Sequence, residues 1–376
     1  MKVAIIHYWL VGMRGGEKVV EGLCEMYPQA DIFTHVYVPD MVSAQIRQHK
    51  IIPTFINALP RASKMYKTYL PLMPLALEQL DLRGYDLVIS SESGPAKGVI
   101  PPAAALHVCY CHTPMRYIWD KHGDYFGRDA SFVARFGMSL WRRYLQTWDI
   151  RSSHRVDCFL ANSRNVGVKI EKLYGREAAV IHPPVDRDQF SISSALKGYY
   201  LIVSALVPYK RIDIAVDAFN RLGMPLKIVG DGPLRARLER SAQPNIEFLG
   251  WVDNESLAEL YGSCQSLIFP GEEDFGIVPL EAQASGRPVI AFRRGGALET
   301  VIGLDESSPA TKSTGIYFAE QSADSLIVAV KTYEQHKDRF DPVFIRQHTA
   351  QFGRPRFKSE IADQIERCLR RHRGDL

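Results

Sequence analysis

Short apolar runs alternate with longer amphipathic segments along nearly the whole chain. The clearest helical pattern has the i, i+3, i+4, i+7 spacing of a helix with one buried face. Its apolar positions are Ile212, Ala215, Val216 and Phe219. Continuous apolar strands separated by helices predict parallel sheets covered on both faces. The predicted strands form two series, first 3–7, 31–36, 86–90, 106–111, 157–161 and 178–181, then 200–205, 226–230, 246–249, 266–270, 288–292 and 315–318.

The break between the two series marks a predicted domain boundary. It falls at His182-Pro183-Pro184 and the polar stretch 191–198, which suits a stiff, exposed linker. A length of 376 residues also fits two domains. We therefore predict an α/β protein with two doubly wound, Rossmann-like domains whose sheets face each other across a cleft. The predicted spans are 1–190, 191–356 and a C-terminal helix, 357–376, that can cross back to the first domain.

Composition and charge narrow the class of protein. A formal net charge of +4 is too small to indicate a nucleic-acid-binding protein. The first residues lack the features of a signal peptide, and no apolar run approaches the ~18–20 residues that span a bilayer. The six cysteines are scattered, which predicts free thiols in a reducing compartment. These features together predict a cytoplasmic protein.

Two short clusters raise the question of a metal site. His107, Cys109, Cys111 and His112 offer zinc-ligand side chains, but they lack the paired spacing of a zinc knuckle. Cys109 and Cys111 share one face of a predicted strand, which favours buried structural cysteines. The triplet 186–188 reads Asp-Arg-Asp but follows the Pro-Pro linker, so a turn is the favoured interpretation. We predict no metal.

A loop that follows a predicted buried strand carries the strongest chemical signal. Residues 270–282 read PGEEDFGIVPLEA and pass into a helical pattern that Gly286 ends. Glu273 and Glu281 stand on either side of the predicted helix start. Backbone N–H groups at such a start lack helical partners and attract anions such as a diphosphate. A capped helix with two solvated glutamates is the alternative, and the buried strand and glycine make it less favoured. The N–H groups concerned belong to Phe275, Gly276 and Ile277.

This Glu273-x7-Glu281 element, with Phe275-Gly276 inside it, resembles the signature of family 4 glycosyltransferases, which have the GT-B fold. Other segments resemble the same family: 204–211, 229–233, 248–250, and Gly295-Gly296 with Glu299. The resemblance is close in the second half of the chain and looser in the first. It is greatest to the mannosyltransferase-type subgroup that assembles polysaccharides and lipopolysaccharide O-antigens.

The resemblance implies roles for individual residues. Lys210 would bind the donor diphosphate, and Ala205 stands where the family often has an Arg that Arg211 could replace. Glu273 would bind the donor sugar and His112, at a strand end, would contact it as well. His112, Lys210 and Glu273 are thus the candidate catalytic residues. The candidate donor-binding residues are Gly15, Gly16, Lys210, Arg211, Gly232, Val252, Glu273, Phe275, Gly276, Ile277 and Glu281.

The family resemblance also implies the reaction. We expect a retaining glycosyltransferase that needs no cofactor or metal and prefers GDP-mannose as its donor. The expected acceptor is a lipid-linked glycan. Two stretches, 61–72 and 132–144, combine basic and large apolar residues, which suits a peripheral site on an anionic membrane surface, with an ordinary surface helix as the equal alternative.

Other functions stay open at this point. The same fold could use a UDP-sugar donor, act as a sugar-nucleotide epimerase, or bind a nucleotide sugar without catalysis. An NAD-dependent oxidoreductase is disfavoured because the turn 12–17 lacks the G-x-G-x-x-G spacing.

Overall fold

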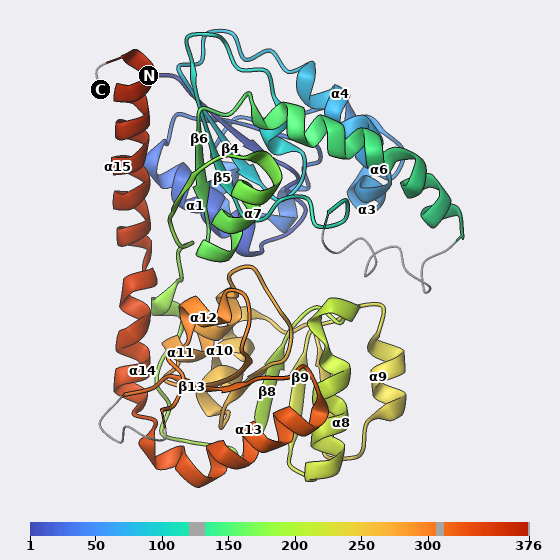
Figure 1. Ribbon diagram of the computed structural model, residues 1–376, viewed down its shortest axis with the longest axis vertical. Helices are drawn as coiled ribbons and strands as arrows, with labels where there is room; N and C mark the ends of the chain where they lie inside the picture. Colours follow the sequence, from blue (N-terminus) through green and yellow to red (C-terminus); the bar gives the residue numbers. More distant parts are fainter. Residues whose placement is uncertain (120–131, 306–311, 375–376) are drawn as a thin grey trace. The chain divides into compact units, whose positions relative to one another are not determined.

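The structure is a computed structural model that describes residues 1–119, 132–305 and 312–374, with the side chains of 132–140 left aside. The chain divides into two compact units (Figure 1). Unit 1 comprises Met1–Pro184 and Arg354–Leu376, and unit 2 comprises Val185–Gly353. The first division therefore follows the Pro-Pro pair directly and lies a few residues before the expected one at 190. The C-terminal segment belongs to unit 1.

Unit 1 is built on a parallel sheet of seven strands in the order β3-β2-β1-β4-β5-β6-β7. Six of the strands match predicted apolar runs. The seventh, β3, was not predicted because it has only three residues and ends in a proline, which is tolerated at the edge of a sheet. The strands are β1 (Val3–His7), β2 (Asp31–Thr34), β3 (Ile51–Pro53), β4 (Leu87–Glu92), β5 (Leu106–Cys111), β6 (Cys158–Ala161) and β7 (Ala178–Val180).

Helices cover both faces of this sheet. On one face, α1 and the returning helix α15 pack through residues such as Leu23 and Phe357. On the other, α4 and α6 pack through residues such as Leu77 and Leu145. The helices of unit 1 are α1 (Gly15–Met26), α2 (Ala44–Arg47), α3 (Ala62–Met65), α4 (Met73–Glu78), α6 (Phe132–Ser153), α7 (Arg164–Tyr174) and α15 (Arg354–Arg373).

A disulfide bond joins α15 to the sheet. Cys158 at the start of β6 is bonded to Cys368, although 210 positions separate them, and their Cα atoms lie 6.5 Å apart. The prediction that all the cysteines are free thiols is therefore wrong for this pair, which only the return of α15 to unit 1 brings together. Cys109 and Cys111 are free and buried, as predicted for structural cysteines.

Unit 2 has a parallel sheet of six strands in the order β10-β9-β8-β11-β12-β13. Each one matches a predicted run, so two parallel-sheet α/β units are confirmed. The stretch 191–198 is hydrogen-bonded to unit 2, for example through the Arg287 guanidinium and the Ser193 carbonyl, and is no linker. The strands are β8 (Tyr200–Val203), β9 (Leu226–Val229), β10 (Ile246–Gly250), β11 (Leu267–Phe269), β12 (Val289–Phe292) and β13 (Gly315–Phe318).

Helices α8 and α13 cover one face of the second sheet, and α10 and α11 pack on the other. The helices of unit 2 are α8 (Ile212–Leu222), α9 (Arg235–Ser241), α10 (Asn254–Ser263), α11 (Ile277–Ala284), α12 (Ala297–Thr300), α13 (Ala323–His336) and α14 (Pro342–His348). Within the described ranges of either unit, no helix has the length and hydrophobicity to cross a membrane.

Candidate functional site

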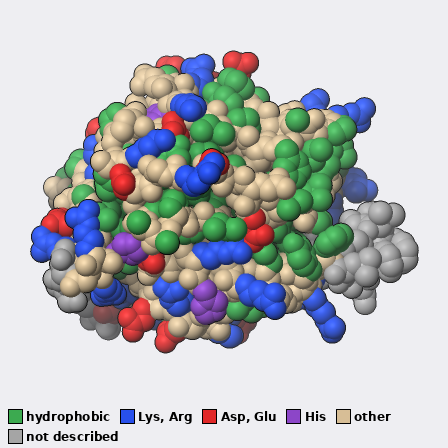
Figure 2. Space-filling model, turned by 90° about the horizontal axis from the view of Figure 1, so that it is seen from above, with side chains coloured by type: hydrophobic (Ala, Val, Ile, Leu, Met, Phe, Trp, Pro, Cys, Tyr) green, Lys and Arg blue, Asp and Glu red, His purple; other side chains and the backbone are tan. Residues whose placement is uncertain are grey.

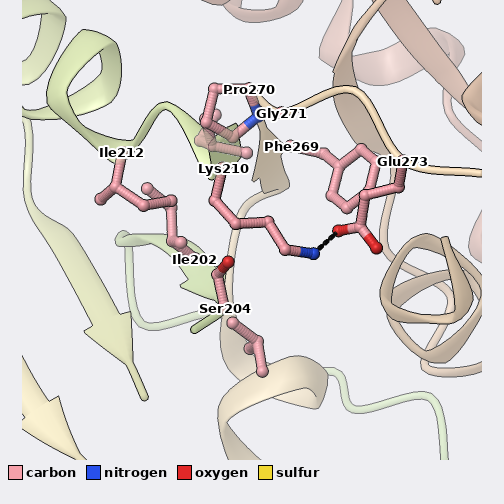
Figure 3. A pocket seen from close by; sticks show the side chains of 10 residues that line it. Ile202, Ser204, Lys210, Ile212, Phe269, Pro270, Gly271 and Glu273 are labelled. Atoms are coloured by element: carbon pink, nitrogen blue, oxygen red, sulfur yellow. Dashed lines mark hydrogen bonds and ion pairs between the residues drawn. The ribbon is translucent and has the colours of Figure 1, made fainter. Parts of the chain in front are cut away.

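The candidate site of unit 2 lies where the strand order of its sheet reverses. The chain runs outward from β8 through β9 to β10, then returns to start again with β11 on the other side of β8. Loops after β8 and β11 therefore diverge and leave a crevice at their carboxyl ends, where ligands of such sheets bind. A small pocket is found here, with lining that includes Ser204, Lys210, Phe269 and Glu273 (Figure 3).

Lys210 and Glu273, predicted separately from two motifs, form an ion pair in this pocket (Figure 3). Both side chains are largely buried, with 14% and 18% exposed. The ammonium group also lies 5.5 Å from the centre of the Tyr209 ring. The pocket, counted with the solvent space at its mouth, has a volume of about 190 Å³. Since whole ligand sites usually measure ~300–1,000 Å³, the pocket can hold one charged group of a ligand, not all of it.

Glycines let neighbouring loops approach the Glu273 loop without side chains between them. The N–H of Gly296 donates to the Glu273 carbonyl oxygen at 2.8 Å. A Cβ atom at Gly295 or Gly296 would overlap the backbone of Glu273 or Phe275. On the other side, Gly232 leaves no room for a Cβ atom against the backbone of Leu206. These glycines thus allow close packing of the backbones of neighbouring loops.

The helix start after Glu273 offers backbone donors. Gly276 precedes α11 with φ of +82°, a left-handed conformation that favours glycine. The N–H groups of Gly276 and Ile277 donate no hydrogen bond to any described residue. The Phe275 side chain instead packs inward against Phe352, with 6.0 Å between ring centres. Two of the three predicted N–H donors therefore have no acceptor among the described residues.

Glu281 is held by a tyrosine that sequence reasoning missed. The Tyr261 hydroxyl donates to Glu281 Oε2 at 2.8 Å. Burial, followed by the Glu281 charge, raises the pKa of Tyr261 well above its usual value, so the phenol keeps its proton and remains a donor. Tyr261 is an apolar-face position of α10 like many others, and no motif in the sequence connects it to Glu281.

Arg211 and Val252, two further predicted residues, lie outside the small pocket. The Arg211 guanidinium binds Asp213 at 3.1 Å and Gln321 at 3.3 Å. Its backbone has φ of +53°, a strained conformation for a residue other than glycine. Val252 follows β10 and packs beside the cluster that includes Leu267. Neither side chain lines the pocket that contains Lys210 and Glu273.

Gly15, Gly16 and His112 belong to unit 1. Gly15 and Gly16 begin α1, and the Tyr8 hydroxyl fills the space that a Cβ atom at Gly16 would need. His112 follows β5, and its Nε2 lies 2.8 Å from Ser91 Oγ. Burial, with a smaller effect from His7, lowers the pKa of His112 to about 3. The ring is therefore neutral at physiological pH and can accept or donate a hydrogen bond, but carries no charge.

The arrangement provides a cation, a carboxylate and backbone donors at a crevice, with a second carboxylate, Glu281, further along α11, which suits a phosphorylated, hydroxyl-rich ligand. Among the described residues, no group of three or more His, Cys, Asp or Glu is placed to hold a metal ion. The Asp186–Asp188 triplet leads into a short 3-10 turn over Arg187–Gln189.

Known proteins resemble the chain in sequence over part of its length. An uncharacterized glycosyltransferase of Methanocaldococcus jannaschii is 30% identical over 181 residues, 47% of this chain and 50% of the relative. The O-antigen chain mannosyltransferase C of Escherichia coli is 30% identical over 158 residues, 37% of this chain and 43% of the relative. A GDP-mannose-dependent α-(1-6)-phosphatidylinositol dimannoside mannosyltransferase of Mycobacterium tuberculosis is 34% identical over 138 residues, 35% of each. These matches span half or less of the relatives' own lengths.

Solved structures resemble the chain over almost all of its length. HepE of Anabaena, crystallised in complex with UDP, superposes with a TM-score of 0.70 at 16% identity and covers 97% of this chain and 100% of its own. WaaG, a glycosyltransferase involved in lipopolysaccharide biosynthesis, superposes with a TM-score of 0.67 at 16% identity, covering 96% and 99%. At this identity the likeness concerns the fold, and it confirms the GT-B prediction.

Family models assign both halves of the sequence. The model described as Glycosyltransferase Family 4 matches residues 13–189, and the one described as Glycosyl transferases group 1 matches residues 197–335. The two matches meet near the division between the units and include the Lys210 and Glu273 motifs. The chain therefore belongs to the family 4 glycosyltransferases and has their GT-B fold.

Proposed function

We propose that the chain is a retaining, metal-independent mannosyltransferase that moves mannose from GDP-mannose onto a lipid-linked glycan acceptor during polysaccharide assembly. The observation that carries the proposal is the Lys210–Glu273 pair at the point where the strand order reverses. Beside it, the N–H groups of Gly276 and Ile277 at the start of α11 have no acceptor among the described residues. The printed names of the E. coli and M. tuberculosis relatives support mannose as the sugar.

Each group at the site has a part in this proposal. Lys210 and the N–H groups of Gly276 and Ile277 take the charge of the diphosphate, so that no metal is needed. Glu273 accepts hydrogen bonds from the sugar, His112 contacts the same sugar, and Glu281 binds the ribose. The bond from the sugar's anomeric carbon to phosphate oxygen breaks as the acceptor oxygen bonds to that carbon on the same face. The acceptor's proton passes to the departing phosphate. Catalysis is then mainly positioning and electrostatics.

A UDP-sugar donor is the second candidate. It is favoured by the fold of HepE, whose crystals contain UDP and, in another structure, UDP-glucose. The residues after β10 that would contact the base begin with Trp251, which is 82% exposed. Its ring is free to face either base, so a direct comparison of nucleotides is needed.

GDP-mannose is expected to raise the melting temperature of the protein by roughly 5–10 °C. A ligand at 100 times its Kd contributes about 2.7 kcal/mol, and each kcal/mol moves a domain of 150–250 residues by about 2–4 °C. A thermal-shift series with GDP, GDP-mannose, UDP, UDP-glucose and ADP-glucose measures this. In a turnover assay with the stabilising donor, activity should persist in EDTA.

A pair of lysine variants provides the control. Lys210→Met should lose most of the shift, whereas Lys197→Met should keep it, because Lys197 is also paired with a glutamate, Glu259, but lies outside the pocket. A shift with UDP-sugars alone would contradict the GDP-mannose proposal. Loss of activity in EDTA, restored by magnesium or manganese, would contradict metal independence.

Unit 1 carries a basic and apolar surface that suits peripheral membrane binding. The expected continuous helix over 61–72 is instead short α3 followed by a 3-10 segment that contains Pro71. Tyr66 and Leu70 are buried there, but Met65 and Leu72 are each 41% exposed and Leu75 is 50% exposed. Figure 2 shows hydrophobic side chains gathered on the right, the side on which α3, α4 and α6 lie in Figure 1, with Lys and Arg at the margins. In the second stretch, Trp141 and Tyr144 are exposed too.

Replacing Arg61, Lys64 and Lys67 together with Ser is expected to weaken binding to anionic vesicles by up to ~1 kcal/mol per charge. Co-sedimentation with phosphatidylglycerol-containing vesicles measures the effect. A triple variant at Arg237, Arg240 and Lys331, all exposed and in unit 2, removes the same charge elsewhere. If both variants weaken binding equally, or if neither does, the surface is an ordinary solvated one and not a membrane-binding site.

A further inference from the structure

Four polar side chains of unit 1 form a continuous line that ends at His112. Glu17 Oε1 lies 3.7 Å from His7 Nε2, and His7 Nδ1 lies 3.1 Å from Ser91 Oγ. Ser91 Oγ in turn lies 2.8 Å from His112 Nε2. Only His112 keeps part of its surface exposed; the other three are buried. Nδ1 of His112 has no hydrogen-bond partner among the described residues.

The fold of unit 1 brings these residues together at the place where its strand order reverses. His7 ends β1, and parallel pairing sets Ser91 of β4 directly beside it. His112 follows β5, the next strand, and its backbone N–H donates to the Glu92 carbonyl at 2.7 Å. Glu17 lies in the first turn of α1, and its other oxygen, Oε2, accepts the Arg14 backbone N–H at 3.0 Å. Each link is therefore held by the sheet or by a helix start.

The charge of Glu17 favours one arrangement of protons when each imidazole carries a single proton. A carboxylate only accepts, so the His7 nitrogen that faces Glu17, Nε2, carries the proton; at 3.7 Å this contact is electrostatic rather than a hydrogen bond. His7 Nδ1 then accepts from the Ser91 hydroxyl. The Ser91 oxygen accepts from His112 Nε2–H. Nδ1 of His112 is left as a bare acceptor.

We propose that Glu17, His7 and Ser91 are positioning residues that set the tautomer and orientation of His112, so that its Nδ1 accepts a hydrogen bond from a ligand hydroxyl. The catalytic consequence rests on the proposed function, in which that ligand is the donor sugar. The tautomer itself is a property of unit 1 and can be measured without substrate. The hydrogen bond that one ring nitrogen of a histidine makes commonly determines which of the two nitrogens is protonated.

The position of Arg14 makes Glu17→Gln a sharp test. A glutamine there needs its carbonyl oxygen for the Arg14 N–H, which leaves its NH₂ group facing His7 Nε2. Every hydrogen bond in the line then reverses: His7 Nδ1–H donates to Ser91, and Ser91 donates to His112 Nε2. His112 must carry its proton on Nδ1. A merely structural role for Glu17 predicts no such reversal.

Nitrogen-15 NMR of histidine-labelled protein reads the tautomer, with the His112 signals assigned by their loss in His112→Gln. We expect Nε2–H in the wild type, Nδ1–H in Glu17→Gln, and a mixture in Ser91→Ala. Donor turnover in both variants should show kcat lowered by about 10-fold, as for one lost hydrogen bond in the transition state, with KM little changed. Ser90→Ala is the matched control. Ser90 lies on the same strand as Ser91 and is equally buried, and its Oγ is hydrogen-bonded to another histidine, His107, with 2.9 Å between Oγ and Nε2.

The outcomes separate this proposal from the proposed function. Ser90→Ala should cost similar stability but leave the His112 spectrum and kcat unchanged. A wild-type His112 with its proton on Nδ1, or a tautomer that Glu17→Gln and Ser91→Ala leave alone, would overturn the proposal. The expected spectra without turnover of any nucleotide sugar would support the tautomer and contradict the transferase function instead.

Discussion

Glu273→Gln is expected to lower kcat by roughly 10²–10³-fold and to leave the donor KM almost unchanged. The proposed contact of Glu273 is with the transferred sugar, whose charge develops in the transition state. Only interactions that strengthen in the transition state raise kcat, and loss of one preorganised polar contact of this kind costs about that much. Steady-state kinetics with varied donor measures both constants.

The Lys210–Glu273 ion pair leads to a second expectation, for the affinity of the nucleoside diphosphate. Glu273 is paired with Lys210 in this structure. A nucleoside diphosphate must compete with that carboxylate for the ammonium group, so the neutral glutamine should let the diphosphate bind as tightly as in the wild type or more tightly. Isothermal titration with the nucleoside diphosphate tests this. Glu272→Gln, one position earlier in the same loop, removes the same charge from a side chain outside the pocket and should keep most of the activity.

Glu281→Gln is expected to give the opposite kinetic pattern. A ribose contact changes little during the reaction, so its loss should raise the donor KM and spare kcat, the signature of lost uniform binding. Tyr261→Phe should reproduce part of this effect, because the Tyr261 hydroxyl holds Glu281 at 2.8 Å. A collapse of the melting temperature in Glu273→Gln or Glu281→Gln, or the two kinetic patterns exchanged, would show that these roles are wrong.

Reduction of the Cys158–Cys368 disulfide is expected to lower the melting temperature of unit 1 by roughly 4–20 °C. The bond closes a loop across 210 sequence positions. Loops of that length give the largest entropic penalty to the unfolded chain, and native disulfides typically contribute 2–5 kcal/mol. Each kcal/mol corresponds to about 2–4 °C for a domain of this size. Differential scanning calorimetry with and without a thiol reductant measures the shift.

A variant separates this bond from other effects of the reductant. Cys368→Ser should melt like the reduced wild type and should not respond to the reductant. Alkylation of the denatured, unreduced wild type should modify four of its six cysteines, since Cys24, Cys109, Cys111 and Cys264 are free. Alkylation of all six, with no effect of the reductant on melting, would mean that the two thiols are not bonded in the folded protein.

Features that depend on neighbouring residues in the chain could be predicted from the sequence. The strands β1, β5 and β13 have the predicted bounds, because continuous apolar runs bury both faces of a parallel sheet wherever they lie. The start of α11 was also predictable, since Gly276 marks it locally. The resemblance of 270–282 to a family motif indicates Glu273 as a site residue from the sequence alone.

Features that depend on distant residues meeting in space could not be predicted. No pattern couples Lys210 with Glu273, Tyr261 with Glu281, or Cys158 with Cys368, because each pair joins separate elements. The short edge strand β3 has too few residues for a periodic signal, and its pairing with β2 supplies what its own sequence lacks. Neither His7 nor Ser91 belongs to a motif in the sequence, and only parallel pairing sets the two side by side. Local patterns therefore predicted the two sheets, whereas strand order and the return of α15 decided which polar groups face one another.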